Sequence, residues 1–352
     1  MTPQQQRPLL SICIPTFNRA LLLKEAVESI LAQAEAVNTA DLEIVISDNA
    51  SSDETAKVVA DLSLSAKVPI QYFKNESNFG FDVNCLKVVE RASGEYAWIL
   101  GDDDLLAAGA LQRVTREIGA IPQADLFYGE KEDFLLTPDR PMRYRRIMPF
   151  PGVTIFDFKR QRTIEEYFRT NKKLIAYFNY LSNIIFKRES WLRTENKEAY
   201  LGSKYIHVYI FQKMLWGAAP GLLAYLPFPV VKRRWGNDSF VGPAERLMVD
   251  VTMYHRIAAG VFTDQKYVRM IDELVIRNDG YSWAVRAKIN DPQRFNRVIW
   301  PFLVRYYWSQ PLFWLKIAPL IFLPTLLLRF GRGLYRKTVK GEPLNIKAML
   351  EG

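Results

Sequence analysis

The sequence predicts an α/β fold, with a mixed, mainly parallel sheet and helices on both of its faces. Two features of residues 9–115 indicate this class. Short apolar segments of strand length alternate with longer segments whose apolar residues recur at helical spacing. Polar or acidic clusters directly follow three of the apolar segments. Such alternation is typical of parallel sheets, because consecutive parallel strands need a crossover that a helix usually provides.

Each element of this first part has its own pattern. The segment "LLSICIP" (9–15) is an apolar strand that Pro15 closes, and residues 19–34 carry apolar side chains at helical spacing. The segment "SSDETAKVVADL" begins a second helix, with Ser51 or Ser52 as the expected N-cap. The other expected strands are 42–48, 70–75 and 96–100, and the third helix is 82–92.

Later segments are less regular, and they suggest three parts of the chain. We expect a main domain over residues 1–240, with halves 9–115 and 116–240, a helical extension over 241–298 and an apolar tail over 299–352. The expected elements beyond residue 115 are a strand within 180–191, a helix over 204–216, a strand and polar loop over 225–240, and helices over 244–290.

The composition narrows the classes of function. The 352 residues include 47 Lys or Arg and 38 Asp or Glu, which gives a formal charge of +9. The cations gather at the tail beside apolar groups and not along an aromatic groove, so we expect no nucleic-acid binding. Cys13 and Cys85 lie in apolar surroundings and should be free, buried thiols. The first residues lack the pattern of a secretory signal.

Polar clusters should meet at one edge of the sheet. The first strand ends at "PTFNR", the second at "SDNASSD" and the fourth at "GDDD". Ligands bind at the carboxyl ends of parallel strands. Adjacent carboxylates repel each other by about 1 kcal/mol in water, and a divalent cation removes this repulsion, since oxygen ligands suit Mg²⁺ and Mn²⁺. An exposed acidic turn is the alternative, and the strand before the triplet argues against it.

Three segments together resemble family 2 glycosyltransferases of the GT-A fold: "SICIPTFNR", "EIVISDNASSDET" and "NFGFDVNCLKVVERASGEYAWILGDDDLL". The resemblance covers residues 9–115. "LGDDDLL", "LSNIIF" and "YIH" are similar to the branch that includes bacterial abequosyltransferases, which modify O-antigen repeats. The resemblance implies an inverting transfer of one sugar, for example a dideoxyhexose, from a nucleotide-sugar donor with Mn²⁺ or Mg²⁺. Residues 9–115 would bind the donor and residues 116–240 the acceptor.

The resemblance also implies the donor site. The first loop should line the base and ribose, and Arg19 should touch phosphate or else lie on the helix surface. Asp48 should receive the base, with capping of the second helix as the alternative, while Asn49 and Gly80 shape turns. The expected nucleotide-binding residues are Pro15, Thr16, Phe17, Asn18, Arg19, Asp48, Asn78 and Asp102.

Within the acidic triplet, Asp102 and Asp104 match the two ends of the family's D-x-D motif. Asp104 is expected to contact the metal, and Asp102 to lie beside the ribose or next to the metal. Asp103 is expected to contact the donor sugar. A register shifted by one residue is the alternative.

The general base is less clearly marked. Many family members use an acid of an "ED" pair near the middle of the chain, and "GSKYIHVYIFQ" stands there without one. His207 lies near the position of that acid, and an imidazole with its ordinary pKa of about 6.5 can accept a proton. A core or surface histidine is the alternative, and Glu189 and Glu198 are substitutes for the base.

Two basic segments complete the predictions. Arg233 and Arg234 in "RRWGNDSF" should pair with phosphate from a loop, with a solvated loop as the alternative. The tail is apolar and aromatic over 299–330, and five cations without an acid follow between Arg329 and Lys340. We expect interfacial helices at the cytoplasmic face of the bacterial inner membrane, or else a helix packed on the domain or on a second subunit. The resemblance implies an oligosaccharide acceptor linked to undecaprenyl diphosphate.

Two rival functions use the same features. A catalytically inactive, membrane-bound scaffold would keep the fold and bind no nucleotide. A nucleotidyltransferase would need a glycine-rich phosphate loop after the first strand, and "PTFNRA" contains no glycine.

Overall fold

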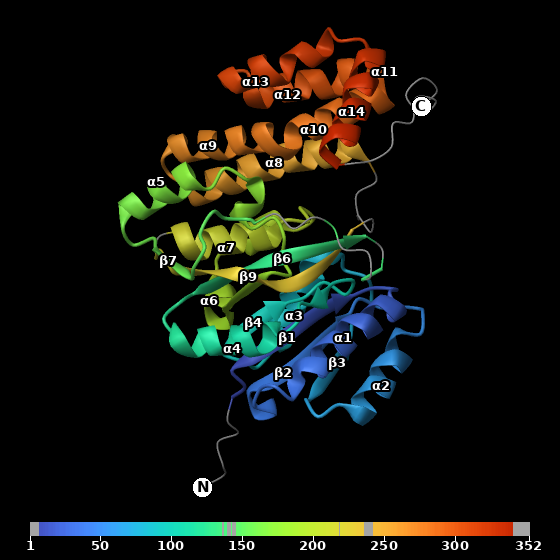
Figure 1. Cartoon of the computed structure of the whole chain (residues 1–352), viewed down its shortest axis with the longest axis vertical. Helices are drawn as coiled ribbons and strands as arrows, with labels where there is room; N and C mark the ends of the chain where they lie inside the picture. Colours follow the sequence, from blue (N-terminus) through green and yellow to red (C-terminus); the bar gives the residue numbers. More distant parts are fainter. Residues whose placement is uncertain are drawn as a thin grey trace. The chain divides into compact units, whose positions relative to one another are not determined.

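A computed structural model describes residues 7–135, 137–138, 142, 146–217, 219–235 and 242–340 (Figure 1). Internal contacts divide the chain into two compact units, Met1–Asp238 and Ser239–Gly352. The first unit contains the sheet. The described part of the second unit is helical.

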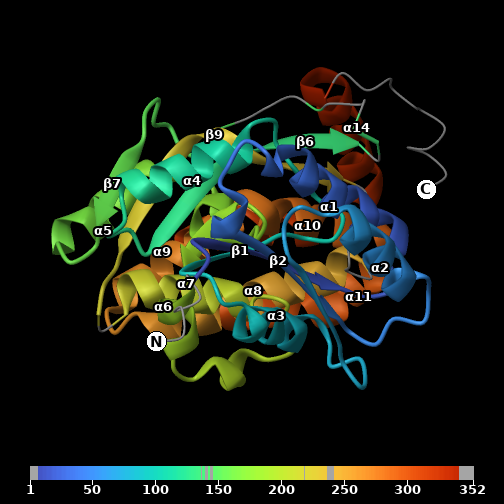
Figure 2. The same cartoon turned by 90° about the horizontal axis from the view of Figure 1, so that it is seen from below.

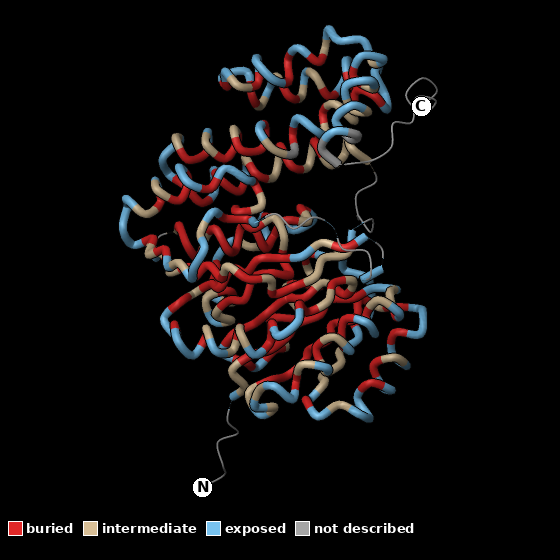
Figure 3. The backbone as a smooth tube through the Cα atoms, in the orientation of Figure 1, coloured by how far each residue is buried: buried red, intermediate tan, exposed pale blue. Residues whose placement is uncertain are grey.

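The described strands of the first unit form one mixed sheet. They are β1 Leu10–Thr16, β2 Leu42–Asp48, β3 Ile70–Lys74, β4 Tyr96–Ile99, β5 Leu105–Leu106, β6 Leu126–Leu135, β7 Thr154–Asp157, β8 Ile184–Lys187 and β9 Leu222–Trp235. Their order is β3-β2-β1-β4-β8-β6-β9-β5, and β7 pairs with β9. β1 to β4 pair in parallel, whereas β8 is antiparallel to both β4 and β6. The central strands are buried along their length (Figure 3).

Helices cover both faces of this sheet, as the sequence predicted. They are α1 Ala20–Ala34, α2 Thr55–Ser65, α3 Phe81–Arg91, α4 Ala110–Ala120, α5 Gln161–Thr170, α6 Arg188–Arg193 and α7 Ile206–Trp216, with short 3₁₀ turns at Thr39–Asp41, Leu174–Tyr177 and Lys197–Tyr200. Val27 of α1, Val59 of α2 and Val114 of α4 join one apolar core with Ile12 and Trp98 of the sheet. Figure 2 shows α1 and α4 on one side of β1 and β2, and α3 on the other.

Local details differ from the sequence-based expectations at two places. The expected N-cap is wrong, because α2 begins at Thr55 and Ser51 Oγ instead accepts a hydrogen bond from the Asn18 amide at 2.8 Å. Asp53 Oδ1 accepts from the Thr55 amide at 3.2 Å and so supports the helix start. Residues 233–235, expected in a polar loop, belong to β9 instead, where Arg233 pairs with Asp133 of β6. Cys13 and Cys85 are free and buried, as predicted.

The described part of the second unit consists of α-helices of 3 to 19 residues, two π-helical turns and one 3₁₀ turn. They are α8 Pro243–Val261, α9 Gln265–Val275, the π-turn Ile276–Gly280, α10 Tyr281–Asn290, α11 Pro292–Arg294, the π-turn Phe295–Ile299, α12 Trp300–Tyr307, α13 Pro311–Lys316, a 3₁₀ turn Ala318–Ile321 and α14 Thr325–Lys340. α10 contacts both α8 and α14, so the described helices of the expected extension and of the expected tail pack together within this unit. Taken singly, none of the described helices is long and apolar enough to cross a bilayer. The helical segments Pro311–Ile321 and Thr325–Tyr335 are long and apolar enough only when taken together, and a bend of 114° separates them.

One ion pair in the second unit should make stability depend on pH. His255 Nδ1 lies 3.1 Å from Asp272 Oδ2, and this hydrogen bond raises the pKa of His255 above its ordinary value. The stabilisation is complete below pH about 6.5 and is lost as pH rises through the raised pKa of the folded state. We expect His255→Gln to remove a pH-dependent contribution of about 0.5 kcal/mol, small because the imidazole is partly exposed to solvent. Urea unfolding at pH 6 and pH 8 measures this, and an unchanged difference between the two pH values in the variant would contradict it.

Candidate active site

The carboxyl ends of β1, β2 and β4 lie next to one another at one edge of the sheet. Thr16 and Asp48 are partners in the register of β1 and β2, and the Asn49 amide donates to the Thr16 carbonyl at 2.9 Å. Thr16 Oγ1 donates to Asp102 Oδ2, also at 2.9 Å, just beyond β4. The predicted gathering of the three polar clusters is therefore confirmed.

Asp102 is held by residues of the first loop. Arg19 Nη1 lies 2.9 Å from Asp102 Oδ1 and 3.5 Å from Asp103 Oδ2. Burial raises the pKa of Asp102 to about 6, because the charged form loses its water, and the charge of Arg19 partly opposes this shift. Arg19 therefore contacts the acidic triplet in this structure, and its contact with a phosphate stays a prediction.

Asp104 is held from the other side by three donors. The Tyr180 hydroxyl and Ser182 Oγ each donate to Asp104 Oδ2 at 2.6 Å, and the Arg234 amide donates to Oδ1 at 3.2 Å. Burial and the charge of Asp103 raise the pKa of Asp104 to about 7. The sequence analysis did not identify Tyr180 and Ser182. The only available signal was their position directly before β8, which pairs with β4.

Asp103 is the most exposed member of the triplet. Its side chain is 18% exposed, against 8% for Asp102, and Asp104 is buried. Within the described ranges, no three His, Cys, Asp or Glu side chains form a metal-binding group. The carboxylates still fit a divalent cation, since they are hard oxygen donors and a cation would reverse the pKa increases that burial and repulsion cause.

Basic residues of β9 and β6 surround this edge. Arg234 Nε donates to the Asp103 carbonyl at 3.0 Å, and its Nη2 lies 2.5 Å from Glu25 Oε2. Arg233 pairs with Asp133 through two contacts of 2.8 and 3.1 Å. Both arginines thus contact carboxylates or the triplet backbone from the strand itself, and their predicted role on a phosphate remains a prediction. The loop residues 236–240 lie outside the described residues.

Lys131 is a further basic group that the sequence analysis missed. Its Nζ lies 2.6 Å from Asp133 Oδ1. Burial, together with the charge of Arg233, lowers the pKa of Lys131 to about 8. The guanidinium of Arg233 and the Lys131 ammonium lie 5.4 and 5.8 Å from the ring centre of Tyr180. These two cations therefore lie close to Tyr180, which donates to Asp104.

The first loop is fixed to the loop after β2. Asn18 has a positive φ of 51°, which Asn tolerates better than most residues. Its Oδ1 accepts from the Ser52 amide at 2.8 Å. Of the residues expected to line the base and ribose, Pro15 and Thr16 are buried, whereas Phe17 and Asn18 are exposed. Contact of all four residues with a nucleotide stays a prediction.

Asp48 and Asn78 shape turns in this structure. Asp48 is fully buried, with Oδ1 accepting from the Ser51 amide at 2.8 Å and Oδ2 from the Tyr72 hydroxyl at 2.5 Å. Asn78 Oδ1 accepts from Asn49 Nδ2 at 2.7 Å and from the Gly80 amide at 2.9 Å. Gly80 has a φ of 82°, which explains a glycine at this turn. Contact of Asp48 or Asn78 with a base stays a prediction.

His207 lies in an apolar part of α7. It is buried, with the rings of Phe81, Tyr205 and Phe211 between 6.2 and 6.5 Å away. Burial lowers its pKa to about 3, and a hydrogen bond with the backbone of Asn179 opposes this shift only in part. The imidazole is therefore neutral and a weak proton acceptor. This environment is that of a core histidine, the alternative to the predicted base.

Asp82, at the start of α3, is a carboxylate that the sequence analysis overlooked. Its Oδ2 accepts from the Lys204 amide at 3.0 Å, in the segment just before α7. Burial raises its pKa, and its buried Oδ1 has no partner among the described residues. The charges of Asp82 and Asp102 both raise the pKa of buried Cys85. The substitutes Glu189 and Glu198 are exposed or paired with Arg193.

Comparisons with known proteins agree with this geometry. The family model "Glycosyl transferase family 2" matches residues 11–191. Abequosyltransferase RfbV of Salmonella typhimurium is 34% identical over 253 residues, which cover 71% of this chain and 74% of the relative. The GalNAc(5)-diNAcBac-PP-undecaprenol beta-1,3-glucosyltransferase of Campylobacter jejuni is 40% identical over 111 residues, 31% of this chain and 34% of that protein.

A solved structure supports the fold. S. aureus TarS in complex with UDP-GlcNAc superimposes with a TM-score of 0.62 at 13% identity, over 96% of this chain and 93% of that one. At this identity the likeness speaks for the fold alone, and the fold class predicted from the sequence is confirmed. Since the family model spans half of the chain and the RfbV alignment most of it, the chain belongs to glycosyltransferase family 2 and is a glycosyltransferase.

Proposed function

We propose that this glycosyltransferase moves one sugar from a nucleotide-sugar donor to a lipid-linked oligosaccharide, in the synthesis of O-antigen or a related surface polysaccharide. The observation that supports this most is the acidic triplet beyond β4, in which Asp102 and Asp104 are buried. The pKa values of Asp102 and Asp104 are raised to about 6 and 7. A cation bound with a diphosphate beside these carboxylates would stabilise their charged forms, which burial and repulsion destabilise. The TarS complex with UDP-GlcNAc also supports a nucleotide-sugar donor.

The sugar and the acceptor follow from the relatives. The abequosyltransferase relative supports a dideoxyhexose as the transferred group. The Campylobacter relative, named for an undecaprenol-linked substrate, supports an acceptor on undecaprenyl diphosphate. We propose that the enzyme works at the cytoplasmic face of the bacterial inner membrane, with its second unit on the membrane surface. Trp308, Leu315 and Phe322 of that unit are 68%, 75% and 86% exposed, as a membrane-facing surface requires.

The chain's own residues would hold and orient the donor. Asp104, with Asp102, would hold Mn²⁺ or Mg²⁺, which when bound supplies positive charge to the leaving diphosphate. Asp103, the most exposed carboxylate of the triplet, would contact the donor sugar. Thr16 and Arg19 keep Asp102 in place, and Arg233 and Arg234 would approach phosphate oxygens once their carboxylate partners release them.

In the proposed reaction, a base takes the proton of the acceptor hydroxyl. The oxygen then bonds to the anomeric carbon from the face opposite the nucleotide, while the bond from that carbon to the diphosphate breaks and the nucleoside diphosphate leaves with the bonding electrons. The sequence predicted His207 as the base. Asp82 is our candidate instead. Burial raises its pKa, although hydrogen bonds from the backbone of residues 202–206 oppose this shift, whereas burial lowers the pKa of His207 to about 3.

Replacement of the metal-binding carboxylate tests the central part of the proposal. We expect Asp104→Asn to lower transfer by about 100-fold or more, since a neutral amide cannot replace a charged metal ligand. Product formation from a panel of nucleotide sugars measures this. Asp61→Asn, an exposed change of the same kind on α2, is the matched control. A folded Asp104→Asn enzyme with full activity would refute the assignment.

Matched neutral variants distinguish the two candidate bases. We expect Asp82→Asn to lose kcat by about 100-fold and to remove the acidic limb of the pH–rate profile, whereas His207→Gln retains most activity. Single-turnover transfer across pH 5 to 9 measures both effects, and circular dichroism checks the fold. A large loss of kcat in His207→Gln, with most activity kept in Asp82→Asn, would instead identify His207 as the base.

Nucleotide titration separates an active transferase from a scaffold. We expect at least one of UDP, CDP, GDP and dTDP to bind about tenfold more tightly with Mn²⁺ than with EDTA, because the cation offsets the repulsion between carboxylates and diphosphate. Isothermal titration calorimetry measures this. Absence of binding by all four, with and without Mn²⁺, would favour the inactive scaffold.

A further inference from the structure

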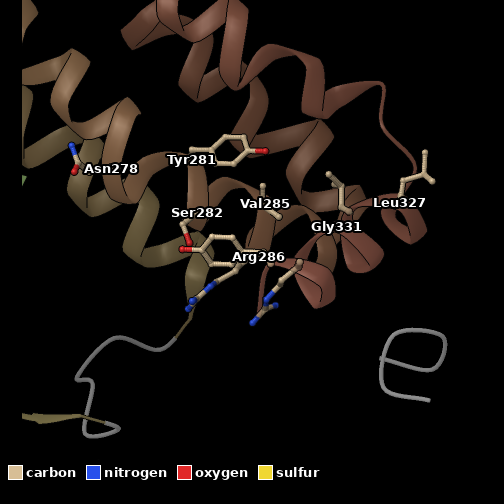
Figure 4. A pocket seen from close by; sticks show the side chains of 10 residues that line it. Asn278, Tyr281, Ser282, Val285, Arg286, Leu327 and Gly331 are labelled. Carbon is tan, nitrogen blue, oxygen red and sulfur yellow. The ribbon is translucent and has the colours of Figure 1, made fainter. Parts of the chain in front are cut away.

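The second unit contains a cavity of about 680 Å³ between α10 and α14, within the size range of small-ligand sites (Figure 4). Ser282 and Arg286 line it from α10, and Leu327, Gly331, Arg332 and Tyr335 line it from α14. All of these residues lie within one compact unit, separate from the acidic triplet in the sheet. The proposed transfer reaction uses none of them.

The charged side chains that line the cavity are all positive. Arg286 and Arg332 contribute two guanidinium groups, and none of the described residues that line the cavity is acidic. Within the described part of the chain Arg286 has no ion-pair partner, and its guanidinium lies 4.6 Å from the Trp283 ring centre. The Ser282 hydroxyl adds a further donor. A set of arginines and hydroxyls without a carboxylate is suited to phosphate oxygens.

The surface beside the cavity is apolar. Leu327, Phe330 and Leu334 follow one another at helical spacing on α14, and they are 58%, 47% and 59% exposed. Tyr281 and Tyr335, at the cavity, are 42% and 53% exposed. Exposed apolar groups next to cations, with tyrosines between them, fit the boundary between headgroups and hydrocarbon of a bilayer.

We propose that this cavity binds the phosphate of an anionic phospholipid headgroup, with Arg286 and Arg332 on the phosphate oxygens and the acyl chains along the Leu327–Leu334 face. Charge complementarity selects this occupant, because a purely apolar partner would leave the Arg286 guanidinium and the Ser282 hydroxyl facing hydrocarbon. The inference rests on the membrane association in the proposed function, and it adds a specific headgroup site to a general attraction between basic residues and an anionic leaflet.

Gly331 allows a test that preserves the fold. A Cβ built at Gly331 meets no atom within 4 Å, and most residues favour a helix more than glycine does, so a longer side chain can enter the cavity without displacing its neighbours. Gly331→Glu places a negative charge where the phosphate would lie. Gly331→Gln has nearly the same shape without the charge and serves as its matched control.

The experiment is vesicle co-sedimentation of the full-length chain with phosphatidylcholine alone or with added phosphatidylglycerol. We expect binding only when phosphatidylglycerol is present, and a loss of about tenfold or more for Arg286→Ala/Arg332→Ala and for Gly331→Glu relative to Gly331→Gln. Arg269→Ala/Arg297→Ala removes two exposed charges elsewhere in the unit and should have a smaller effect. An equal loss in this control, equal binding of the Gly331 pair or equal binding to neutral vesicles would overturn the proposal.

A second measurement separates this inference from the proposed function. Hydrolysis of the donor without vesicles should be the same in Arg286→Ala/Arg332→Ala and in the unaltered enzyme. If no nucleotide sugar is hydrolysed but vesicle binding follows the expected order, the proposed function fails and the headgroup site stands. If hydrolysis occurs and the cavity variants bind vesicles as well as the unaltered chain does, the headgroup site is refuted and the proposed function is not.

Discussion

The burial of Asp102 and Asp104, two of three consecutive carboxylates beyond β4, is the constraint on which the site depends. Two charges about 4 Å apart interact by about 1 kcal/mol in water and by more in a less polar environment, so the triplet needs donors or a cation around it. The fold supplies donors from separate parts of the chain. Thr16 and Arg19 hold Asp102, whereas Tyr180, Ser182 and the Arg234 amide hold Asp104.

The hydrogen bonds from these donors do not fully offset the increase in pKa that burial causes. The pKa values of Asp102 and Asp104 remain raised, to about 6 and 7. A divalent cation beside these carboxylates would stabilise their charged forms and so offset the desolvation and repulsion that raise their pKa values. The sheet topology makes this possible, because β8 brings Tyr180 and Ser182 to β4, and β9 brings Arg234 to the same edge.

Much of the donor half could be predicted from the sequence because its signals are local. The strand 42–48 and the meeting of three polar clusters follow from apolar periodicity and from the geometry of parallel sheets. Tyr180, Ser182 and Lys131 could not be found in this way, since ordinary residue types reach the site only through strand pairing between distant segments. The environment of His207 could not be predicted from the sequence either. Its position lies near that of a family acid, but burial among aromatic rings lowers its pKa. The start of α2 depended on Asp53, whose contacts with Ala20 and Thr55 are tertiary as well as local.

The most direct test of the account is diffraction at the manganese edge from crystals grown with Mn²⁺ and a nucleoside diphosphate. The account predicts one anomalous peak about 2.1 Å from a carboxylate oxygen of the triplet, with diphosphate oxygens on its far side. A nucleotide bound elsewhere, with Asp102 and Asp104 keeping their present partners and no peak near them, would contradict it.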